Sequence, residues 1–573
     1  MSTFATGDPV AVNLEQFIDR LHDGLTPPQI ENDWVDAKEE PGRRAGRTVQ
    51  PGSATNEQAA QLIAEAAACF ANTLTGGAVL VGIADDGTAI GTELDPVWLR
   101  SRIGELTDNG MFPYVVERTV LDVRCLAVLA HPSPVPIKVG GRVRMRVDDN
   151  CKPVPEGHWF QTRAAIGQYD WSSQASATSA EDVSPTALEA ARRFLQESGE
   201  PAAADLAESR DGELLRRLDV VTVDGWLSNA GSVLFTRTDR PVLDYIYRDR
   251  AGQPSRLRIE RGDVGAIEQF TEVMSAVRLA LPSAQVLDPS GAAVGTFPAL
   301  PNRARREAVV NAIAHRDWID AAPVTIELTG TALVVNSPGR FVGGVTPTNI
   351  ITHPSVRRSP HLTEVLAKLR LAERQAVGVD TMFLEMLRDG HAAPVIEETA
   401  TGVRVVLAGG DPDQEWVNAL RRLEPPTLLG DLDATLIIDH IARTGYATTS
   451  SAATVLQRSS PEAALALSNL RKARIDGRPV IVAVDGDRER DTPAYQLPDP
   501  ATYGPRSRSN DPDDRAHLLL MYAREKGRIT SREAMALTRV TRPTALSDLD
   551  ALVRDEQLVP AGSGPRAHFV PAK

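Results

Sequence analysis

The sequence has little cysteine and no long apolar run. Its three cysteines, Cys69, Cys125 and Cys151, are scattered over 573 residues, and neither their odd number nor their spacing fits a disulfide framework or a zinc site. Cys69 falls within an apolar helical pattern, where we expect a small core residue. No hydrophobic run approaches membrane-spanning length, and the first residues lack the basic and apolar segments of a signal peptide. We therefore expect a cytoplasmic protein with no membrane contact.

Lysine is also scarce: only seven of the 62 basic residues are lysine, and alanine is abundant, a bias common in GC-rich bacteria. The net charge of −14 excludes a surface that is positive all over. A local basic face is still enough to bind nucleic acid. The length suits about three to five domains, each able to bury a core.

One helical pattern carries an acid, an amide and a histidine at four-residue spacing. Glu307, Asn311 and His315 would line one face of this helix. An asparagine oxygen can ligate a Mg²⁺ that bridges phosphates, and a glutamate can orient or deprotonate water. The alternative is a capped surface helix, which an isolated E-x-x-x-N pattern often is. The residues expected to cover the packed flank are Val309, Val310 and Ile313.

The segments after this helix favour the nucleotide interpretation. Two strands are predicted, at 324–329 and 332–336, and the second ends in Asn336-Ser-Pro-Gly339. Next come Arg357-Arg-Ser-Pro360 and Glu373-Arg-Gln-Ala-Val-Gly378. Over about residues 300 to 395 this order resembles the divergent GHKL-type ATPase module found behind Schlafen AlbA-like domains and often labelled helicase RecG-related. The pattern of that family reads roughly R-E-A-x-x-N-A-x-x-H-R-D, N-P-G, R-N-P-x-L and E-x-x-G-x-G-I.

The resemblance implies an ATP-binding sandwich of helices on a mixed sheet. Asn311 would be the ligand of an ATP-bound Mg²⁺, Glu307 the candidate base of at most a weak ATPase, and Asn336 a neighbour of the adenine. The other nucleotide-binding positions that the resemblance implies are His315, Gly339 and Gly378.

This sequence departs from the family pattern at three positions. Ala376 stands where the first glycine of the phosphate loop is expected, which leaves Gly378 to allow close backbone approach. Ser359 replaces the usual asparagine before Pro360, and Asn336 replaces an aspartate. The departures favour ATP binding over rapid hydrolysis.

A second pattern occupies the N-terminal third. A polar turn at 31–34 leads into a strand, and a later helix ends at Asn72-Thr73. Gly76-Gly77 would make a tight turn before a buried strand at 78–83, and Asp86-Gly87 would close a hairpin. Over about residues 28 to 155 this resembles the Schlafen AlbA-like domain, whose pattern is E-x-x-x-x-E-F-K followed by A-F-A-N-T-x-G-G-x-L-x-I-G-V-x-D-D-G.

The resemblance implies two alternative functions for this domain. As a nucleic-acid-binding module it would use basic residues such as Arg142, Arg144 and Arg146, which share one strand face; a solvated face is the simpler alternative. As a metal-dependent nuclease it would use three acids, and the matching positions are Glu31, Asp36 and Asp85. Asp36 stands where glutamate is usual, and all three acids would also suit a strand start and a turn.

Beyond about residue 425, three predicted helices and a hairpin follow in winged helix-turn-helix order, and the order then repeats. Segments 171–186 and 498–514 look like linkers. If the second unit binds DNA, its reading helix begins at Thr541, and such units also serve as dimer-forming modules. The residues that would then face DNA are Arg539, Arg542, Thr544 and, in the wing, Arg566. Other basic candidates are Arg471, Lys472 and Arg474 in the first unit, and the cluster at 248–261.

These patterns predict an α+β multidomain protein: an AlbA-like α/β domain, a GHKL-like α/β sandwich and two winged helices. The expected segments are 1–170, 186–299, 300–424, 425–497 and 513–573. We expect an ATP- and Mg²⁺-binding regulator, such as a transcriptional regulator or defence-type sensor, that binds DNA in preference to RNA and forms a homo-oligomer. The alternatives are a metal-dependent ribonuclease or nuclease, and an oligomeric scaffold with a vestigial ATP site.

Overall fold

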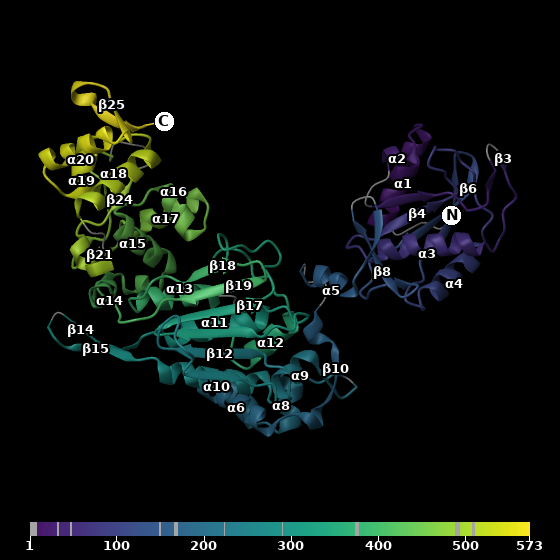
Figure 1. Cartoon of the computed structure of the whole chain (residues 1–573), viewed down its shortest axis with the longest axis horizontal. Helices are drawn as coiled ribbons and strands as arrows, with labels where there is room; N and C mark the ends of the chain where they lie inside the picture. Colours follow the sequence, from purple (N-terminus) through teal and green to yellow (C-terminus); the bar gives the residue numbers. More distant parts are fainter. Residues whose placement is uncertain are drawn as a thin grey trace. The chain divides into compact units, whose positions relative to one another are not determined.

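The computed structural model describes residues 8–30, 34–45, 48–147, 150–165, 170–222, 224–288, 290–372, 378–487, 493–506 and 510–572. The chain forms two compact units, residues 1–169 and 170–573, and each is described by itself (Figure 1).

The N-terminal unit is built on a sheet whose strand order is β1-β4-β6-β5. β1 runs parallel to β4, and the other neighbours are antiparallel. The strands are β1 (Val35–Lys38), β4 (Gly77–Val81), β5 (Tyr114–Val120) and β6 (Val123–Ala130). The helices of this unit are α1 (Pro9–His22), α2 (Pro27–Ile30), α3 (Glu57–Ala71), α4 (Pro96–Leu106) and α5 (Glu156–Ala165).

Both faces of this sheet are covered, which explains the unbroken apolar run of β4. Alternate residues of a strand point to opposite faces. Ala78 and Leu80 share an apolar cluster with α1, whereas Val79 and Val81 share another with α3. A Cβ on Gly77 would lie 2.2 Å from the Phe70 ring, so the predicted glycine turn is what lets α3 approach the sheet.

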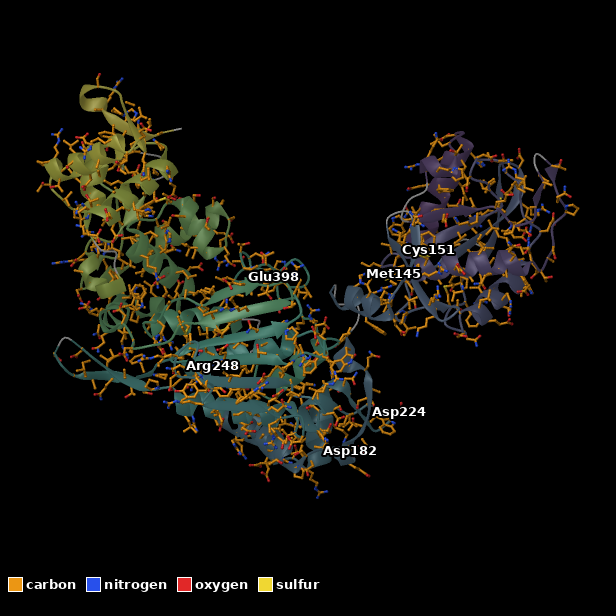
Figure 2. All side chains as sticks on the ribbon, viewed as in Figure 1. Met145, Cys151, Asp182, Asp224, Arg248 and Glu398 are labelled. Carbon is orange, nitrogen blue, oxygen red and sulfur yellow. A yellow bond between two sulfur atoms is a disulfide. The ribbon has the colours of Figure 1, made fainter. Side chains whose placement is uncertain are left out.

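Two cysteines meet beside α3, against the prediction. Cys69 on α3 and Cys151 on β9 form a disulfide with Cα atoms 6.0 Å apart, while Cys125 is buried and free. Scattered spacing gave no sign of the pair because 82 residues separate the two positions. Figure 2 labels Cys151 beside Met145 of the neighbouring strand. The N-terminal unit has a second sheet, whose strands are β7 (Lys138–Val139), β8 (Arg142–Val147) and β9 (Asn150–Val154). A separate hairpin pairs β2 (Arg44–Ala45) with β3 (Thr48–Val49).

The second unit begins with an ordered segment where the sequence predicted a linker. The Trp171 indole stacks on Trp318, with ring centroids 5.4 Å apart. The Asp170 carboxylate accepts a hydrogen bond from the His361 backbone N–H at 2.7 Å. The predicted linker is therefore wrong: aromatic stacking and side-chain capping order this Ser- and Thr-rich segment. Its elements are η1 (Trp171–Ser173), β10 (Ala175–Ser179) and η2 (Ala180–Asp182).

A helical layer follows. Residues 226–235 form a short strand and a helix, and the Ser228 hydroxyl caps the helix by accepting from the Gly231 N–H. The elements are α6 (Pro185–Glu197), α7 (Pro201–Glu208), α8 (Asp211–Arg217), β11 (Trp226–Ser228), α9 (Asn229–Phe235) and α10 (Ala266–Ala280). The hairpin of β14 (Ser283–Leu287) and β15 (Ala293–Pro298) projects from this layer as an arm (Figure 1).

The central sheet has the strand order β13-β12-β16-β17-β19-β18, in which β12 and β16 are parallel. One face carries the main apolar cluster, which joins alternate strand residues such as Val335 to α11 and α13. The strands are β12 (Leu243–Arg248), β13 (Leu257–Glu260), β16 (Val324–Thr329), β17 (Ala332–Pro338), β18 (Val395–Glu398) and β19 (Gly402–Leu407). The helices are α11 (Asn302–His315), α12 (Pro360–Lys368) and α13 (Gly378–Arg388).

The C-terminal part contains two helical units with short strands. The first has α14 (Gln414–Arg421), β20 (Leu423–Glu424), η3 (Pro426–Gly430), α15 (Leu432–Thr444), α16 (Thr449–Leu456), α17 (Ser460–Leu470), β21 (Arg474–Ile475), β22 (Arg478–Pro479), β23 (Val482–Ala483) and β24 (Tyr495–Gln496). The second has α18 (Pro512–Lys526), α19 (Ser531–Thr538), α20 (Arg542–Arg554), β25 (Leu558–Ala561), η5 (Gly564–Arg566) and β26 (His568–Pro571). Within the described ranges, no helix is long and apolar enough to cross a membrane.

The segment between these units is also ordered over part of its length. η4 (Pro500–Arg506) places Tyr503 against Trp416, with ring centroids 5.9 Å apart. Tyr503 is buried, so this part of the predicted second linker belongs to the packed core of the first helical unit.

Candidate nucleotide site

A cavity of about 190 Å³ lies where α11, β17 and α13 meet. Glu307, Asn311 and His315 line it from α11, which places the three residues of the sequence pattern on one wall as predicted. Gly339 and Gly378, two further predicted positions, line it as well. Apolar side chains form another part of the wall: Val335, Met382, Ile396, Val403 and Val405.

Gly378 is the first residue of α13 and stands against the polar residues of α11. A Cβ at this position would lie 2.6 Å from Glu307 Oε2 and 3.3 Å from Asn311 Nδ2. The Glu307 side chain is held inside, since the residue is 2% exposed. Helix N-termini present free N–H groups and positive potential, which suits phosphate. Ala376 lies outside the described residues.

Gly339 has a φ of 95°, and a Cβ there would lie 2.8 Å from Asp317 Cβ. The glycine of the Pro-Gly pair is therefore needed both for its backbone conformation and for its close approach to the residue that follows α11. The neighbouring Ser337 hydroxyl donates to the Ala312 carbonyl at 2.9 Å, which ties β17 to α11 at the cavity.

Asn336 does not reach the cavity. Its Nδ2 donates to Thr325 Oγ1 at 3.1 Å across the sheet, on the face opposite Val335 and Ser337. The structure thus corrects the expectation that Asn336 lies beside the adenine: strand alternation turns it away, and Ser337 lines the cavity instead.

Positive groups border the cavity on the side of the loop after β17. Arg357 and Arg358 both line it, and Arg358 is 8% exposed, with Nε donating to the His315 carbonyl at 3.1 Å. Burial, with the nearby Arg358 and Arg357 charges, lowers the pKa of His315 to about 4. The imidazole is therefore neutral at pH 7, and the arginines supply the charge that would attract phosphate. Neither arginine was among the predicted site residues, although the Arg357-Arg358 pair stood in the sequence pattern.

The loop of residues 339–358 roofs the cavity, and its start is anchored to the sheet. Glu398, labelled in Figure 2 at the end of β18, accepts hydrogen bonds from Arg340 Nε at 2.8 Å and from the Phe341 backbone N–H at 3.1 Å. The Arg340 hydrogen bond is the main cause that lowers the pKa of Glu398. The roof residues between 345 and 356 continue the lining: Val345, Ile350, Ile351, His353, Pro354, Ser355 and Val356.

Two of the three acids predicted for a nuclease, Asp36 and Asp85, lie within the described residues. Glu31 lies outside the described residues. Asp36 Oδ1 pairs with Lys38 Nζ at 2.9 Å, and Asp85 is exposed in the turn after β4. Over the described ranges, no group of three His, Cys, Asp or Glu side chains could hold a metal ion.

The predicted basic face of β8 is partly turned inward. Arg144 pairs with Glu65 of α3 at 3.2 Å, and the Arg146 guanidinium lies 5.0 Å from the centre of the Phe70 ring, while Arg142 is exposed. In the cluster at 248–261, the arginines with ion pairs to nearby acids are Arg248, Arg256, Arg258 and Arg261. Arg248 is labelled at the end of β12 in Figure 2.

In the second helical unit, Arg542 and Arg566 are exposed and Thr544 is partly so. Arg539 is also exposed, but its guanidinium is engaged: Nη1 donates to the Pro498 carbonyl at 2.9 Å and Nη2 to the Leu497 carbonyl. Burial lowers its pKa. The Arg539 guanidinium thus contacts the end of the first helical unit.

One acid of α20 has a partner within the second helical unit. Asp548 forms a two-bond ion pair with Arg515 of α18, at 2.8 and 3.1 Å. Its charge is therefore balanced within the unit. In the first unit, Arg474 NH1 donates to backbone carbonyls at the end of α17, and Arg471 stacks over the Tyr495 ring at 5.7 Å.

Comparison with known families matches two parts of the chain. The family "Schlafen, AlbA_2" matches residues 31–155, and the family described as "Putative ATP-dependent DNA helicase recG C-terminal" matches residues 321–407. The second match includes Ser337, Gly339 and Gly378; the α11 residues of the cavity precede it. No curated protein matches the chain.

The fold and the cavity thus define a protein that joins a Schlafen AlbA_2 domain to a recG C-terminal, HATPase-type domain. Among solved structures, the chain is similar to the DIP2311 protein from Corynebacterium diphtheriae, with 30% identity and a TM-score of 0.61. The similarity covers 98% of this chain and 99% of that one. The chain belongs to the same family as that protein.

Proposed function

We propose that the protein is an ATP-binding regulator that binds nucleic acid, with DNA as the preferred partner. The observation that carries the nucleotide part is the cavity, where Glu307, Asn311 and Gly378 meet beside two arginines. In this proposal Asn311 ligates the Mg²⁺ of Mg-ATP, the N-terminus of α13 and Arg358 hold phosphates, and the apolar wall receives the base. The fit of the donors supports this: an amide oxygen and a carboxylate are oxygen ligands that Mg²⁺ accepts.

Nucleic-acid binding is proposed from the AlbA_2 match together with the C-terminal helical units, which we interpret as winged helices. The exposed basic side chains that would make contact are Arg142, Arg542 and Arg566, with Thr544 beside them. ATP would act as the regulator, Glu307 as the residue that orients water in a slow ATPase, and a transcriptional or defence role would follow from the nucleic acid bound. We propose a homo-oligomer as the working state, in line with the pairing common among winged helices.

Mg-ATP is expected to stabilise the protein against heat, because a ligand that binds only the folded state at 100 times its Kd adds about 2.7 kcal/mol to the free energy of unfolding. Asn311→Ala is expected to lose this increment, since it removes the oxygen that would hold the metal. Thermal unfolding with and without Mg-ATP measures both. Asn469→Ala, at an exposed position on α17, serves as the matched control. An equal shift in the parent and in Asn311→Ala would contradict the site, and no shift in the parent would contradict the function.

Arg542→Ala is expected to weaken DNA binding by a similar factor for all sequences and to lower the salt dependence of the association constant by about one phosphate contact. Arg539→Ala should leave that salt dependence unchanged and lower thermal stability, because it removes donors to the Leu497 and Pro498 carbonyls. Fluorescence anisotropy over a series of salt concentrations separates the two. A loss of salt dependence in Arg539→Ala alone would reverse this assignment.

A further inference from the structure

The roof of the cavity is bonded to the first C-terminal helical unit. The Ile351 backbone N–H donates to Gln457 Oε1 at 2.9 Å, and Gln457 Nε2 donates to the Pro347 carbonyl at 3.0 Å. The Thr352 hydroxyl donates to the Gln457 carbonyl at 2.7 Å. Gln457 therefore holds the roof through its side-chain oxygen, its side-chain nitrogen and its backbone carbonyl. The roof lies more than 100 residues earlier in the chain.

Apolar packing reinforces these bonds. Ile351 lines the cavity and also packs against the apolar core of the first helical unit, so a single side chain contacts both. Helix α13, which forms part of the cavity wall, also packs against the core of the first helical unit. Burial raises the pKa of Asp380 on α13, while the nearby Arg458 charge lowers it and Asp433 raises it. Arg458 in turn pairs with Asp433 at 3.0 Å.

Gln457 and Arg458 form the turn between α16 and α17. Gln457 has a φ of 53° at the C-terminus of α16, and Ser459 caps α17 directly after it. In a helix-turn-helix unit, the N-terminal residues of the second of these helices read the bases. The contact with the roof thus lies at the turn that precedes the helix that would meet DNA.

We propose that the roof of the nucleotide cavity and the α16–α17 turn form one coupled element, through which ATP regulates nucleic-acid binding by the first helical unit. This inference rests on the proposed function and adds to it the route of regulation. Nucleotide that contacts Ile350, Ile351 or Val356 favours one position of the roof over others. Because Gln457 is bonded to the roof, the α16–α17 turn changes position with it. Linkage requires the effect to be reciprocal: DNA bound at the turn changes nucleotide affinity by the same factor, typically about 5- to 150-fold.

The test uses two variants of the full chain, one from each side of the contact. Gln457→Gly removes the amide side chain and keeps the left-handed backbone, and Thr352→Val removes the hydroxyl at nearly constant shape. Thr454→Ala is the control, because Thr454 is exposed on α16 and donates to the Ser450 carbonyl within its own helix. Amide hydrogen exchange is measured at residues 347–352 and 449–470, with and without Mg-ATP, alongside calorimetric titration of the nucleotide.

Without nucleotide, Gln457→Gly is expected to raise the exchange rate at Ile351 at least about five-fold, while Thr454→Ala leaves it unchanged. With Mg-ATP, exchange at residues 449–470 should change in the parent and not in Gln457→Gly or Thr352→Val. Nucleotide binding with unaltered exchange at residues 449–470 would overturn the coupling and leave the proposed function standing. Absence of calorimetric binding in the parent would overturn the proposed function and the regulation with it, whatever the exchange at Ile351.

Discussion

Gly378→Ala is expected to lose most of its affinity for Mg-ATP, by a factor on the order of 100. The new Cβ would stand 2.6 Å from Glu307 Oε2, far inside van der Waals contact, and Glu307 is too buried to swing out. Either the first turn of α13 or the α11 residues must shift, and each of these contributes to the wall that would hold the phosphates and metal. Calorimetric titration with Mg-ATP measures the loss.

The thermal stability of Gly378→Ala distinguishes a steric clash in the cavity wall from unfolding of the protein. Alanine favours a helix over glycine by about 1 kcal/mol, so α13 itself gains propensity from the change. Gly430→Ala is the matched control, since a Cβ there meets nothing within 4 Å and its φ requires no glycine. Undiminished affinity in Gly378→Ala would mean that nucleotide does not use the junction of α11 and α13.

Reduction of the Cys69–Cys151 disulfide is expected to lower the free energy of unfolding of the N-terminal unit by about 2–5 kcal/mol. The bond closes a segment of 82 residues and ties β9 to α3, so its loss releases a large loop in the unfolded chain. Denaturant unfolding of the purified protein, oxidised and reduced, measures this difference in free energy. In a reducing compartment the same residues would stand as two thiols.

Thiol counting tests the pairing directly. Protein purified without reductant and then denatured should present one reactive thiol, that of Cys125, and three after reduction. Cys125→Ser is the control, with none before reduction and two after it. Three reactive thiols in protein purified without reductant would contradict the disulfide.

Local patterns predicted which face of α11 lines the cavity. Helical spacing was enough to place Glu307, Asn311 and His315 on one face, because side chains four residues apart on a helix always share a face. The same rule for strands could have corrected Asn336, since Leu333 and Val335 alternate with it and are buried. The prediction for Asn336 relied on the aspartate of the family pattern and not on the alternation of the strand.

Contacts between distant segments could not be predicted in this way. The Cys69–Cys151 pair, the stacking of Trp171 on Trp318 and the bonds of Gln457 to the roof each join residues more than 80 positions apart. Their own neighbourhoods carry no periodic signal, because such contacts depend on how whole elements pack. Arg539 is similar: its place before a predicted reading helix indicated DNA, and only the packing of the two helical units shows the carbonyl groups that it contacts.

The most direct test of the account is the affinity of the full protein for duplex DNA, measured by anisotropy with and without Mg-ATP at constant salt, in the parent and in Asn311→Ala. We predict that Mg-ATP changes the affinity at least about five-fold in the parent and not in the variant. The same affinity with and without nucleotide in the parent would contradict the central claim that ATP regulates nucleic-acid binding.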